Sequence, residues 1–435
     1  MATRGTPGVL GGRTSIFQLA AAPSVTLLEV VTGGLWIVFF IIASYGATPL
    51  KDYGIERLAW LAADFAALAM ILLRPDDVLR QVRRNLVLMS WPALACASTL
   101  WSLAPASSLY QGIQLLLTVL VGLCLVMTTD LRRILVLLFL ALMAAAVLST
   151  LYELTRGGIG EEWRGVFPHK NVLGNMMAVA VMAGVSLFLS GWRPIISGLG
   201  CLYALVLLAL SRSGTAIVAL CLVISLVPLA LTLHRGPIAA GLAAGVVLIA
   251  ASGGLLTLEL MNIGLDDLYG RTLDALGKDE TLTGRTILWQ FAMDAFDARP
   301  WLGYGYKGWW ESSETSATLL KVVVDQELWF FHNTFLDLAV AFGVVGPTAL
   351  VAGLLVGVYR SIKAFVINGD PVLLWPIMIV AMSIIYCSVD FVLFANHSFP
   401  QLLFVVAVAS ALPAHKNRYG KAGARGTAPA QVGHN

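Results

Sequence analysis

The polar residues that could carry chemistry in this chain stand at the borders of long apolar runs. His332, one of only six histidines, opens the run "HNTFLDLAVAFGVVG", and an imidazole can exchange a proton near neutral pH. Arg212 is at the tip of the short turn "LSRSGTA", and Arg285 begins another segment. Arginine stays charged, and its planar fork can hold two phosphate oxygens. If the chain is an enzyme, its site is made from arginines and a histidine.

Arg285 lies in a stretch that predicts a helix, "LTGRTILWQFAMDAFDARP" at 282–300. Thr283 suits the N-cap, apolar residues recur at helical spacing, and a proline ends the run. The helix dipole disfavours a cation in the first turn. Arg285 is therefore either functional or paired with an acid of the preceding "KDE".

Another group of polar residues begins the apolar run after "FPHKNVLG". We expect His169, Lys170 and Asn171 to bind substrate, although Lys170 could equally be a lysine that snorkels at a helix end. Asp390 is an acid near the end of a different apolar run, and we include it among the binding residues. Asp337, one turn beyond His332, is expected only to help anchor its helix end.

Five tryptophans lie between residues 289 and 329, and two interpretations stay open for them. They could form an interfacial aromatic belt, or their rings could stack on sugar faces. Both roles can hold at once. The five are Trp289, Trp301, Trp309, Trp310 and Trp329.

Composition places these residues in a membrane protein. Hydrophobic residues make up 58% of the 435 residues and charged ones 12%, against about 45–50% and about 25% in soluble domains. The apolar residues come in blocks that approach the roughly 20 residues needed to cross a bilayer. We therefore expect an all-α polytopic membrane protein with about twelve spans. The expected spans are 24–47, 58–73, 86–101, 109–127, 134–152, 172–190, 195–210, 215–233, 237–256, 332–359, 372–394 and 399–413.

The distribution of Lys and Arg predicts how the chain is oriented. With both termini inside, sixteen of the 28 basic residues fall in inner segments, six in short outer loops and six in the long segment 257–331. His332 then faces outward. The predicted organisation is a cytoplasmic tail (1–23), nine spans (24–256), a large periplasmic loop with an amphipathic helix (257–331), three spans (332–413) and a basic cytoplasmic tail (414–435).

Several classes of protein are disfavoured. The basic residues are spread too thinly to predict binding of nucleic acid. No inner loop is large enough for a nucleotide-sugar transferase domain, and no HExxH or other metal-ligand spacing occurs. The five cysteines lie in or beside expected spans and predict neither disulfides nor a metal site. An enzyme of this sequence would work outside, without metal or cofactor, on a substrate that arrives already activated.

The order of four motifs resembles the O-antigen ligase and polymerase superfamily, the Wzy- and WaaL-like proteins. The "FPHKNVLG" and "DETLTGRTILW" variants are most similar to its ExoQ-like exopolysaccharide polymerases. The resemblance covers about residues 85–410. The four motifs are "SRSGTA" with Arg212, "LGKDETLTGRTILW" with Arg285, "RPWLGYGYKGWW", and "HNTFLDLAVAFGVVG" with His332.

The resemblance implies a GT-C-like membrane glycosyltransferase in the bacterial inner membrane, with a periplasmic active site. Its donor would be an undecaprenyl-diphosphate-linked oligosaccharide and its acceptor the growing polysaccharide. Membrane lipid and export-machinery proteins would be further partners. The family's two functional arginines correspond to Arg212 and Arg285, and its histidine to His332. A neutral imidazole there could take the proton of an attacking sugar hydroxyl; the alternative is a histidine satisfied by backbone at a helix start.

Polymerisation is the preferred function, and two alternatives stay open. Family members share a fold but differ in acceptor, so the first alternative is a ligase that transfers the glycan to lipid A-core. The second is a transporter or flippase for the lipid-linked glycan. Transporters tend to carry internal repeats and polar residues near the bilayer midplane. Here no convincing repeat is found, and the polar residues gather at the outer border.

Overall fold

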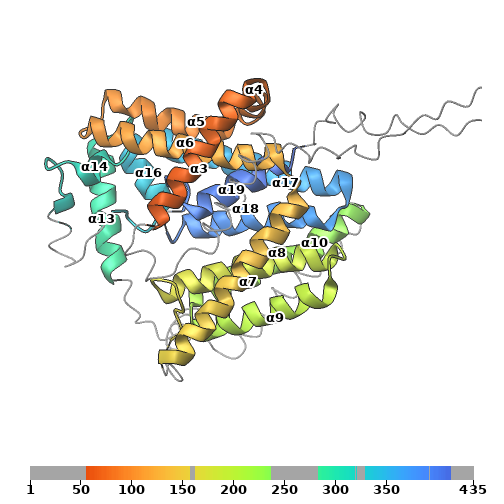
Figure 1. Ribbon diagram of the computed structural model, residues 1–435. Coiled ribbons are helices and arrows are strands. Elements are labelled where there is room, and N and C mark those ends of the chain that lie inside the picture. The colour runs from red at the N-terminus through yellow and green to blue at the C-terminus, as the bar shows by residue number, and fades with distance from the viewer. Residues whose placement is uncertain are drawn as a thin grey trace, which may run out of the picture.

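The computed structural model describes residues 55–156, 162–236, 283–318, 320, 329–390 and 392–412, and every regular element in these segments is a helix (Figure 1). This confirms the all-α class for the described part of the chain. The first helices are α3 (Ile55–Leu73), α4 (Pro75–Arg84), α5 (Leu86–Ala97), η1 (Ser98–Leu100), α6 (Pro105–Thr128), α7 (Leu131–Arg156), α8 (Lys170–Leu189), α9 (Pro194–Leu210) and α10 (Gly214–Arg235). They are followed by α13 (Thr283–Ala298), α14 (Gly308–Glu311), α16 (Thr334–Phe342), α17 (Val345–Asn368), η2 (Pro371–Leu373), α18 (Leu374–Cys387) and α19 (Phe399–Ser410).

Five of these helices are long and apolar enough to cross a membrane: α6, α7, α8, α10 and α17. A sixth candidate is the pair α3 and α4, which is bent by 108°. Pro75 begins α4, and a proline disfavours helical backbone in the residue before it, which accounts for the break at Arg74. The protein is therefore a helical membrane protein.

Other expected spans form shorter helices. The 12 residues of α19 reach only ~18 Å at 1.5 Å per residue, against ~30 Å of hydrocarbon. α19 is buried along most of its length and packs on α6, α17 and α18, so it is a core helix of the bundle. The expected spans 24–47 and 237–256 lie outside the described residues, and the count of twelve stays a prediction.

The expected span 332–359 is divided into two helices. α16 ends before Gly343, whose φ is 62°, and the spanning helix α17 begins only at Val345. Pro300 lies against this break, because its carbonyl accepts the N–H of Val344 at 2.8 Å. A side chain on Gly343 would collide with the backbone of Trp301. Only glycine fits this turn, and the span starts later than expected.

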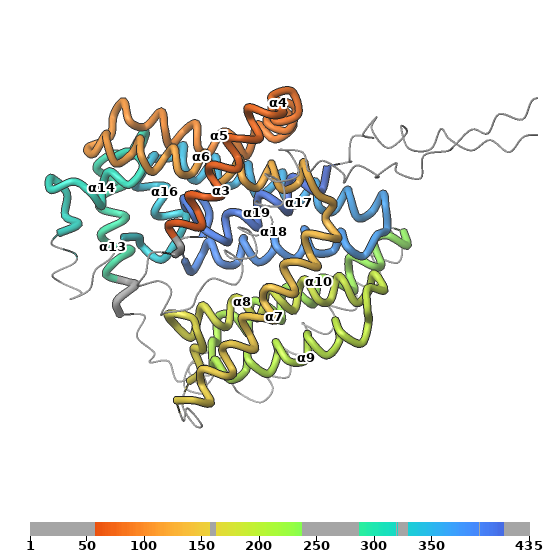
Figure 2. Tube along the Cα trace, viewed as in Figure 1, coloured from red at the N-terminus to blue at the C-terminus, as the bar shows by residue number. Residues whose placement is uncertain are grey.

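The helix ends form two groups of turns on opposite ends of the bundle. α18 and α19 run through the middle, in contact with α6 on one side and with α8 and α10 on the other (Figure 2). Turns that the distribution of Lys and Arg places on the same side of the membrane are in contact with one another in the structure. The contacts are Leu103 with Tyr304, Trp163 with Leu210 and Thr334 with Asp390 at one end, and Arg132 with Ser190 and Asp370 at the other.

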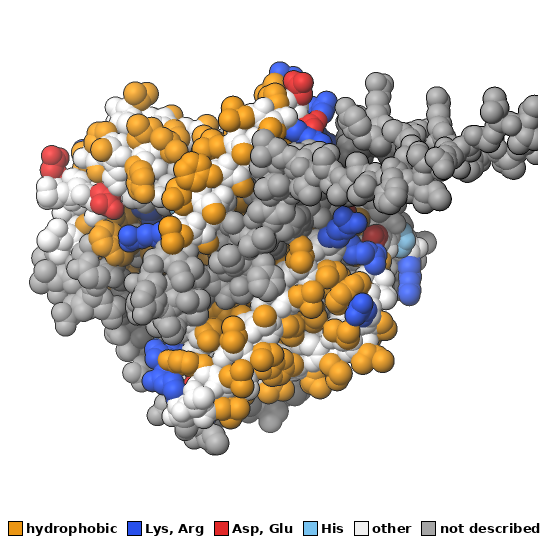
Figure 3. Space-filling model, in the orientation of Figure 1, with side chains coloured by type: hydrophobic (Ala, Val, Ile, Leu, Met, Phe, Trp, Pro, Cys, Tyr) orange, Lys and Arg blue, Asp and Glu red, His pale blue; other side chains and the backbone are white. Residues whose placement is uncertain are grey.

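Large apolar side chains are exposed along the flanks of the helices, among them Leu72, Leu151 and Leu199. Figure 3 shows these apolar flanks, with Lys and Arg side chains gathered toward the ends of the bundle. Soluble monomers rarely expose apolar surface on this scale. The flanks are suited to contact with lipid.

Candidate active site

His332 lies in the short loop that leads into α16. Its φ of 54° is in the left-handed region, where a non-glycine residue needs support from its surroundings. Asn333 supplies part of that support as the N-cap of α16, since its Oδ1 accepts the N–H groups of Phe335 and Leu336 at 2.9 and 3.1 Å. Its amide also donates to the carbonyl of Ser388 at 3.2 Å. The loop is thereby fixed beside the end of α18.

Thr334 brings Asp390 to His332. The N–H and the hydroxyl of Thr334 both donate to the carbonyl of Asp390, at 3.1 and 2.7 Å, and the hydroxyl accepts the N–H of Val392 at 3.2 Å. As a result, Asp390 Oδ1 lies 3.6 Å from His332 Nδ1, with both side chains partly exposed. Two residues predicted for separate roles thus form a histidine–carboxylate pair.

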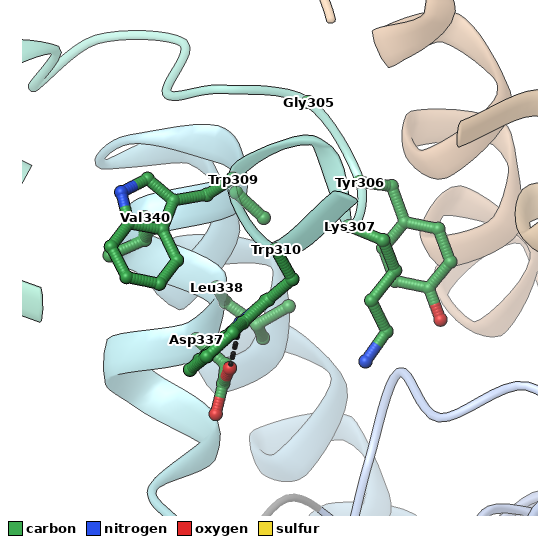
Figure 4. A pocket seen from close by; sticks show the side chains of 9 residues that line it. Gly305, Tyr306, Lys307, Trp309, Trp310, Asp337, Leu338 and Val340 are labelled. Carbon is green, nitrogen blue, oxygen red and sulfur yellow. Dashed lines mark hydrogen bonds between the residues drawn. The ribbon is translucent and has the colours of Figure 1, made fainter. Parts of the chain in front are cut away.

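Asp337 supports the same loop from the interior. Its carboxylate accepts the N–H of Phe331 at 2.9 Å. It also accepts the indole N–H of Trp310 at 3.4 Å, the contact that is dashed in Figure 4. Burial raises the pKa of Asp337 to about 7, although Lys307 and these hydrogen bonds act to lower it. Burial also lowers the pKa of the Lys307 ammonium. Asp337 therefore anchors the residue that precedes His332, a larger role than the sequence suggested.

A small cavity lies behind this loop, between Tyr306, Lys307, Trp309, Trp310 and Asp337 (Figure 4). Its volume of about 20 Å³ suits a single water molecule and is far too small for a sugar ring. The cavity therefore cannot hold a sugar substrate.

Four of the five tryptophans of this region divide into two groups, and the fifth, Trp289, is half-buried. Trp309 and Trp310 are buried and pack around Phe331, so neither the aromatic-belt nor the sugar-stacking interpretation holds for them. Trp301 and Trp329 have 75% and 47% of their surface exposed, and both interpretations stay open there. Only burial distinguishes the two groups, and burial could not be predicted from the composition of the segment.

The residues at the start of α8 form a second polar group. His169 caps this helix, because its Nδ1 accepts the N–H of Asn171 at 3.2 Å. Lys170 makes an ion pair with Glu162 at 2.6 Å. Asn171 accepts the hydroxyl of Ser213 at 3.0 Å and so ties the start of α8 to the turn between α9 and α10.

Arg212 occupies the tip of that turn with an exposed side chain and a φ of 48°. Within the described segments, no hydrogen bond or ion pair joins Arg212 to His332. The two polar groups are linked through neighbouring helices instead, because the hydroxyl of Tyr386 on α18 donates to Asn175 Oδ1 on α8. The structure therefore brings Arg212 to the Asn171 group and Asp390 to His332.

The predicted helix around Arg285 is confirmed as α13, and Arg285 lies in its first turn. The side chain of Arg285 is outside the described part of the structure. α13 packs on α16, and the indole N–H of Trp289 donates to the carbonyl of Phe331 at 3.1 Å. The helix that carries Arg285 is thus bonded to the residue next to His332.

Left-handed backbone gathers at this end of the bundle. Residues held in such conformations cost about 1–3 kcal/mol each and cluster at functional sites. Among the described non-glycine residues, those with positive φ at this end are Arg212, Lys307, His332, Phe394 and His397, and Arg193 is at the other end. No local sequence signal marks these positions.

Glu153 is a buried residue of the site that the sequence analysis missed. It lies near the end of α7 and accepts the N–H groups of Arg164 and Gly165 at 3.0 and 2.7 Å. These bonds fix the loop that leads to His169. An acid at the end of a long apolar helix was the available signal.

This arrangement can exchange a proton and hold an anion. Because Nδ1 of His332 faces Asp390, the other ring nitrogen, Nε2, is the one that can contact a substrate hydroxyl. Arg212 offers an exposed cation at the same end of the bundle. In the described ranges, no three His, Cys, Asp or Glu side chains lie together in a way that could hold a metal ion.

Comparison with known proteins gives two matches. Residues 199–351 match the family described as O-antigen ligase. The chain is also 30% identical over 313 residues to the exopolysaccharide production protein ExoQ of Rhizobium meliloti (strain 1021), across 68% of this chain and 69% of that protein. Arg212, Arg285 and His332 all lie inside the family match. The protein therefore belongs to the O-antigen ligase and polymerase superfamily, in its ExoQ-like branch.

Proposed function

We propose that the protein is a membrane glycosyltransferase that joins undecaprenyl-diphosphate-linked oligosaccharide repeat units into exopolysaccharide. The observation that carries this proposal is the His332–Asp390 pair, 3.6 Å apart. His332 lies in the family segment 199–351, which also contains Arg212 and Arg285, and Asp390 lies beyond it. The description of the ExoQ relative as an exopolysaccharide production protein favours a polymer as the product.

His332 would be the general base. A hydroxyl of the acceptor sugar attacks the anomeric carbon of the donor, and a glycosidic C–O bond forms. The bond from that carbon to the diphosphate oxygen breaks, and the diphosphate leaves with its lipid. His332 accepts the hydroxyl proton, while Asp390 orients the ring and stabilises the imidazolium. General bases of this kind contribute about 10²–10⁴-fold.

The arginines would stabilise the leaving diphosphate. Its charge increases as the anomeric bond breaks, and fixed cations directed at developing charge often give the largest catalytic contribution. Arg212 is exposed on a constrained turn, and Arg285 is in the first turn of α13, where free N–H groups also favour an anion. His169, Lys170 and Asn171 would bind the donor beside Arg212. The proposal requires no metal.

The proposed orientation has both termini in the cytoplasm, about twelve membrane segments including the short buried α19, a periplasmic segment 257–331 and the site at the periplasmic face of the inner membrane, in a GT-C-like arrangement. The pairing of turns at each end of the bundle supports this assignment. Arg132, Arg193 and Arg235 lie in or beside turns of the end opposite His332, as the preference of Lys and Arg for the cytoplasmic side requires. Arg360 lies within α17 and donates to the turn at Arg84 and Asn85.

A ligase that transfers the glycan to lipid A-core is the second candidate. The specific observation in its favour is the family match, which is described as O-antigen ligase. Both candidates use the same donor and the same base, and they differ in the acceptor. Only the fate of the glycan distinguishes them.

Gene deletion followed by glycan analysis tests the choice. A polymerase predicts single repeat units on the lipid carrier and an intact lipopolysaccharide core, whereas a core that lacks glycan would instead indicate the ligase.

Purified protein in detergent should also elongate lipid-linked repeat units in the presence of EDTA. His332→Ala should abolish elongation while the amount of membrane protein is unchanged. Normal elongation by this variant, or activity that EDTA removes and Mg²⁺ restores, would contradict the mechanism.

A further inference from the structure

A second histidine–carboxylate pair lies at the same end of the bundle. His397 Nε2 is 3.0 Å from Asp64 Oδ2, with 20% and 9% of the two side chains exposed. The ring of His397 also stacks on Trp60, with centroids 4.9 Å apart and an angle of 12° between the planes. Trp60 and Asp64 are one turn apart on α3 and therefore share a face of that helix. The pair joins α3 to the loop before α19.

Asp64 is in an unfavourable place for an acid. It lies in the middle of α3, which is part of a candidate membrane span. Removing a carboxylate from water costs several kcal/mol, and a buried ion pair often adds no net stability over apolar residues. Acids inside membrane helices are rare and usually functional. A role in stability alone therefore gives a poor account of Asp64.

The loop 388–398, of which the structure describes every residue but 391, links the two pairs, since Asp390 is near its start and His397 is near its end. Its second half is held by neighbouring helices. The N–H of His397 donates to Thr118 Oγ1 at 2.9 Å, and the amide of Asn396 donates to Gln114 Oε1 at 2.7 Å. Phe394 and His397 both have left-handed backbone, with φ of 59° and 46°. Such a conformation persists only where side-chain contacts hold it.

We propose that Asp64 and His397 are positioning residues for the transfer reaction. They fix the far end of the loop 388–398 and thereby hold Asp390 against His332. Neither residue needs to touch the substrate. The consequence for catalysis rests on the proposed function, whereas the effect on the environment of His332 does not.

Two kinds of variant test this role. Asp64→Leu, His397→Leu and the double variant break the pair, and leucine suits an apolar setting, so folding should be retained. Asp64→Asn and His397→Gln keep a hydrogen-bonding group at each position. His234→Gln is the matched control, because His234 contacts the carbonyl of Val366 at the opposite end.

The first measurement is steady-state kinetics of the purified full chain with lipid-linked repeat units. We expect the leucine variants to lose about tenfold or more in kcat, with KM for the donor within about threefold of wild type. The hydrogen-bonding variants should recover most of that loss, and His234→Gln should behave as wild type. A residue that only supports folding would lower the melting temperature and leave kcat per folded molecule unchanged.

The second measurement does not depend on activity. The rate at which diethyl pyrocarbonate modifies His332 is followed by mass spectrometry of the peptide that contains it, well below the melting temperature. We expect a change of about threefold or more in the leucine variants only. An unchanged rate together with unchanged kcat would overturn the positioning role. If the wild type itself elongates no glycan, the proposed function fails, while the rate of modification of His332 still decides this inference.

Discussion

Asp390 Oδ1 lies 3.6 Å from His332 Nδ1, although the two residues are in different loops that are far apart in the sequence. In catalytic triads, a carboxylate in this position orients the imidazole and stabilises its charged form, without taking the proton itself. The distance is slightly longer than a hydrogen bond, and catalytic contacts often tighten only when substrate is bound. The pair therefore predicts distinct consequences for changes at each residue.

Asp390→Asn should retain the shape of the pair and remove its charge. The imidazolium formed during transfer would lose its neighbouring anion, so we expect kcat to fall by about tenfold or more, which corresponds to ~1.4 kcal/mol. Kinetics of purified protein with lipid-linked repeat units measure this effect. A rate equal to that of wild type would show that Asp390 is not the partner of His332 in catalysis.

Thr334→Val should separate the two residues without a change in side-chain size. The valine variant loses the hydroxyl that bonds to the carbonyl of Asp390 at 2.7 Å and to the N–H of Val392 at 3.2 Å. We expect a fall in kcat of about tenfold. Thr334→Ser keeps the hydroxyl and is the matched control, with near-normal activity. Equal activities of the two variants would contradict this role of the hydroxyl.

Arg212→Lys and Arg285→Lys test whether planar guanidinium groups hold the diphosphate. Lysine keeps the charge but cannot bind two oxygens side by side. We expect each variant to lose at least about tenfold in rate, or ~1.4 kcal/mol. Arg235→Lys, at the opposite end of the bundle, should have no effect. If both site variants work at wild-type rates, the bidentate contact with the diphosphate is absent.

Asp337 predicts a dependence of stability on pH. Burial raises its pKa to about 7 in the folded protein, above the value of about 3.9 for an exposed aspartate. Between these two values the folded protein binds more protons than the unfolded chain, so the free energy of unfolding falls as pH rises. Asp337→Asn cannot titrate and should lose this contribution. The melting temperature in detergent should therefore fall more steeply from about pH 5 to about pH 7 in wild type than in the variant.

The control for this prediction is Asp294→Asn, a change at an exposed position of α13. A plot of its melting temperature against pH should run parallel to that of wild type. Parallel curves for wild type and Asp337→Asn would mean that Asp337 has the same pKa in the folded and unfolded chain.

Local signals in the sequence predicted individual helices well. The helix around Arg285 runs from Thr283 to Ala298, and Pro300 follows it as expected. The break at Gly343 was missed because apolar residues continue on both sides of it. Segment 300–305 causes this break by occupying the space beside α16. Such tertiary contacts leave no mark on local periodicity.

The candidate site, like the fold, could be predicted only in part from the sequence. His332 and Arg212 could be selected because polar residues at the borders of apolar runs are costly. Asp390 and Asn171 were selected as well, as binding residues, but their pairing could not be predicted. Asp390 is held at His332 by Thr334, and Asn171 is bonded to the Arg212 turn through Ser213, and both are tertiary contacts. Asp337 was ranked low because a single acid near a helix start usually serves as an anchor. It is an anchor here as well, but for the loop of His332.

The bonds of Thr334 to the loop 388–398 restrict how this protein can be recombined with its relatives. An exchange of residues 329–343 alone would place the start of α16 from a relative beside the native loop. The hydrogen bonds of Thr334 to Asp390 and Val392 could then be lost. An exchange of both segments together would transfer the histidine–carboxylate pair as a unit. Chimeras built to alter glycan specificity should therefore move the two segments jointly.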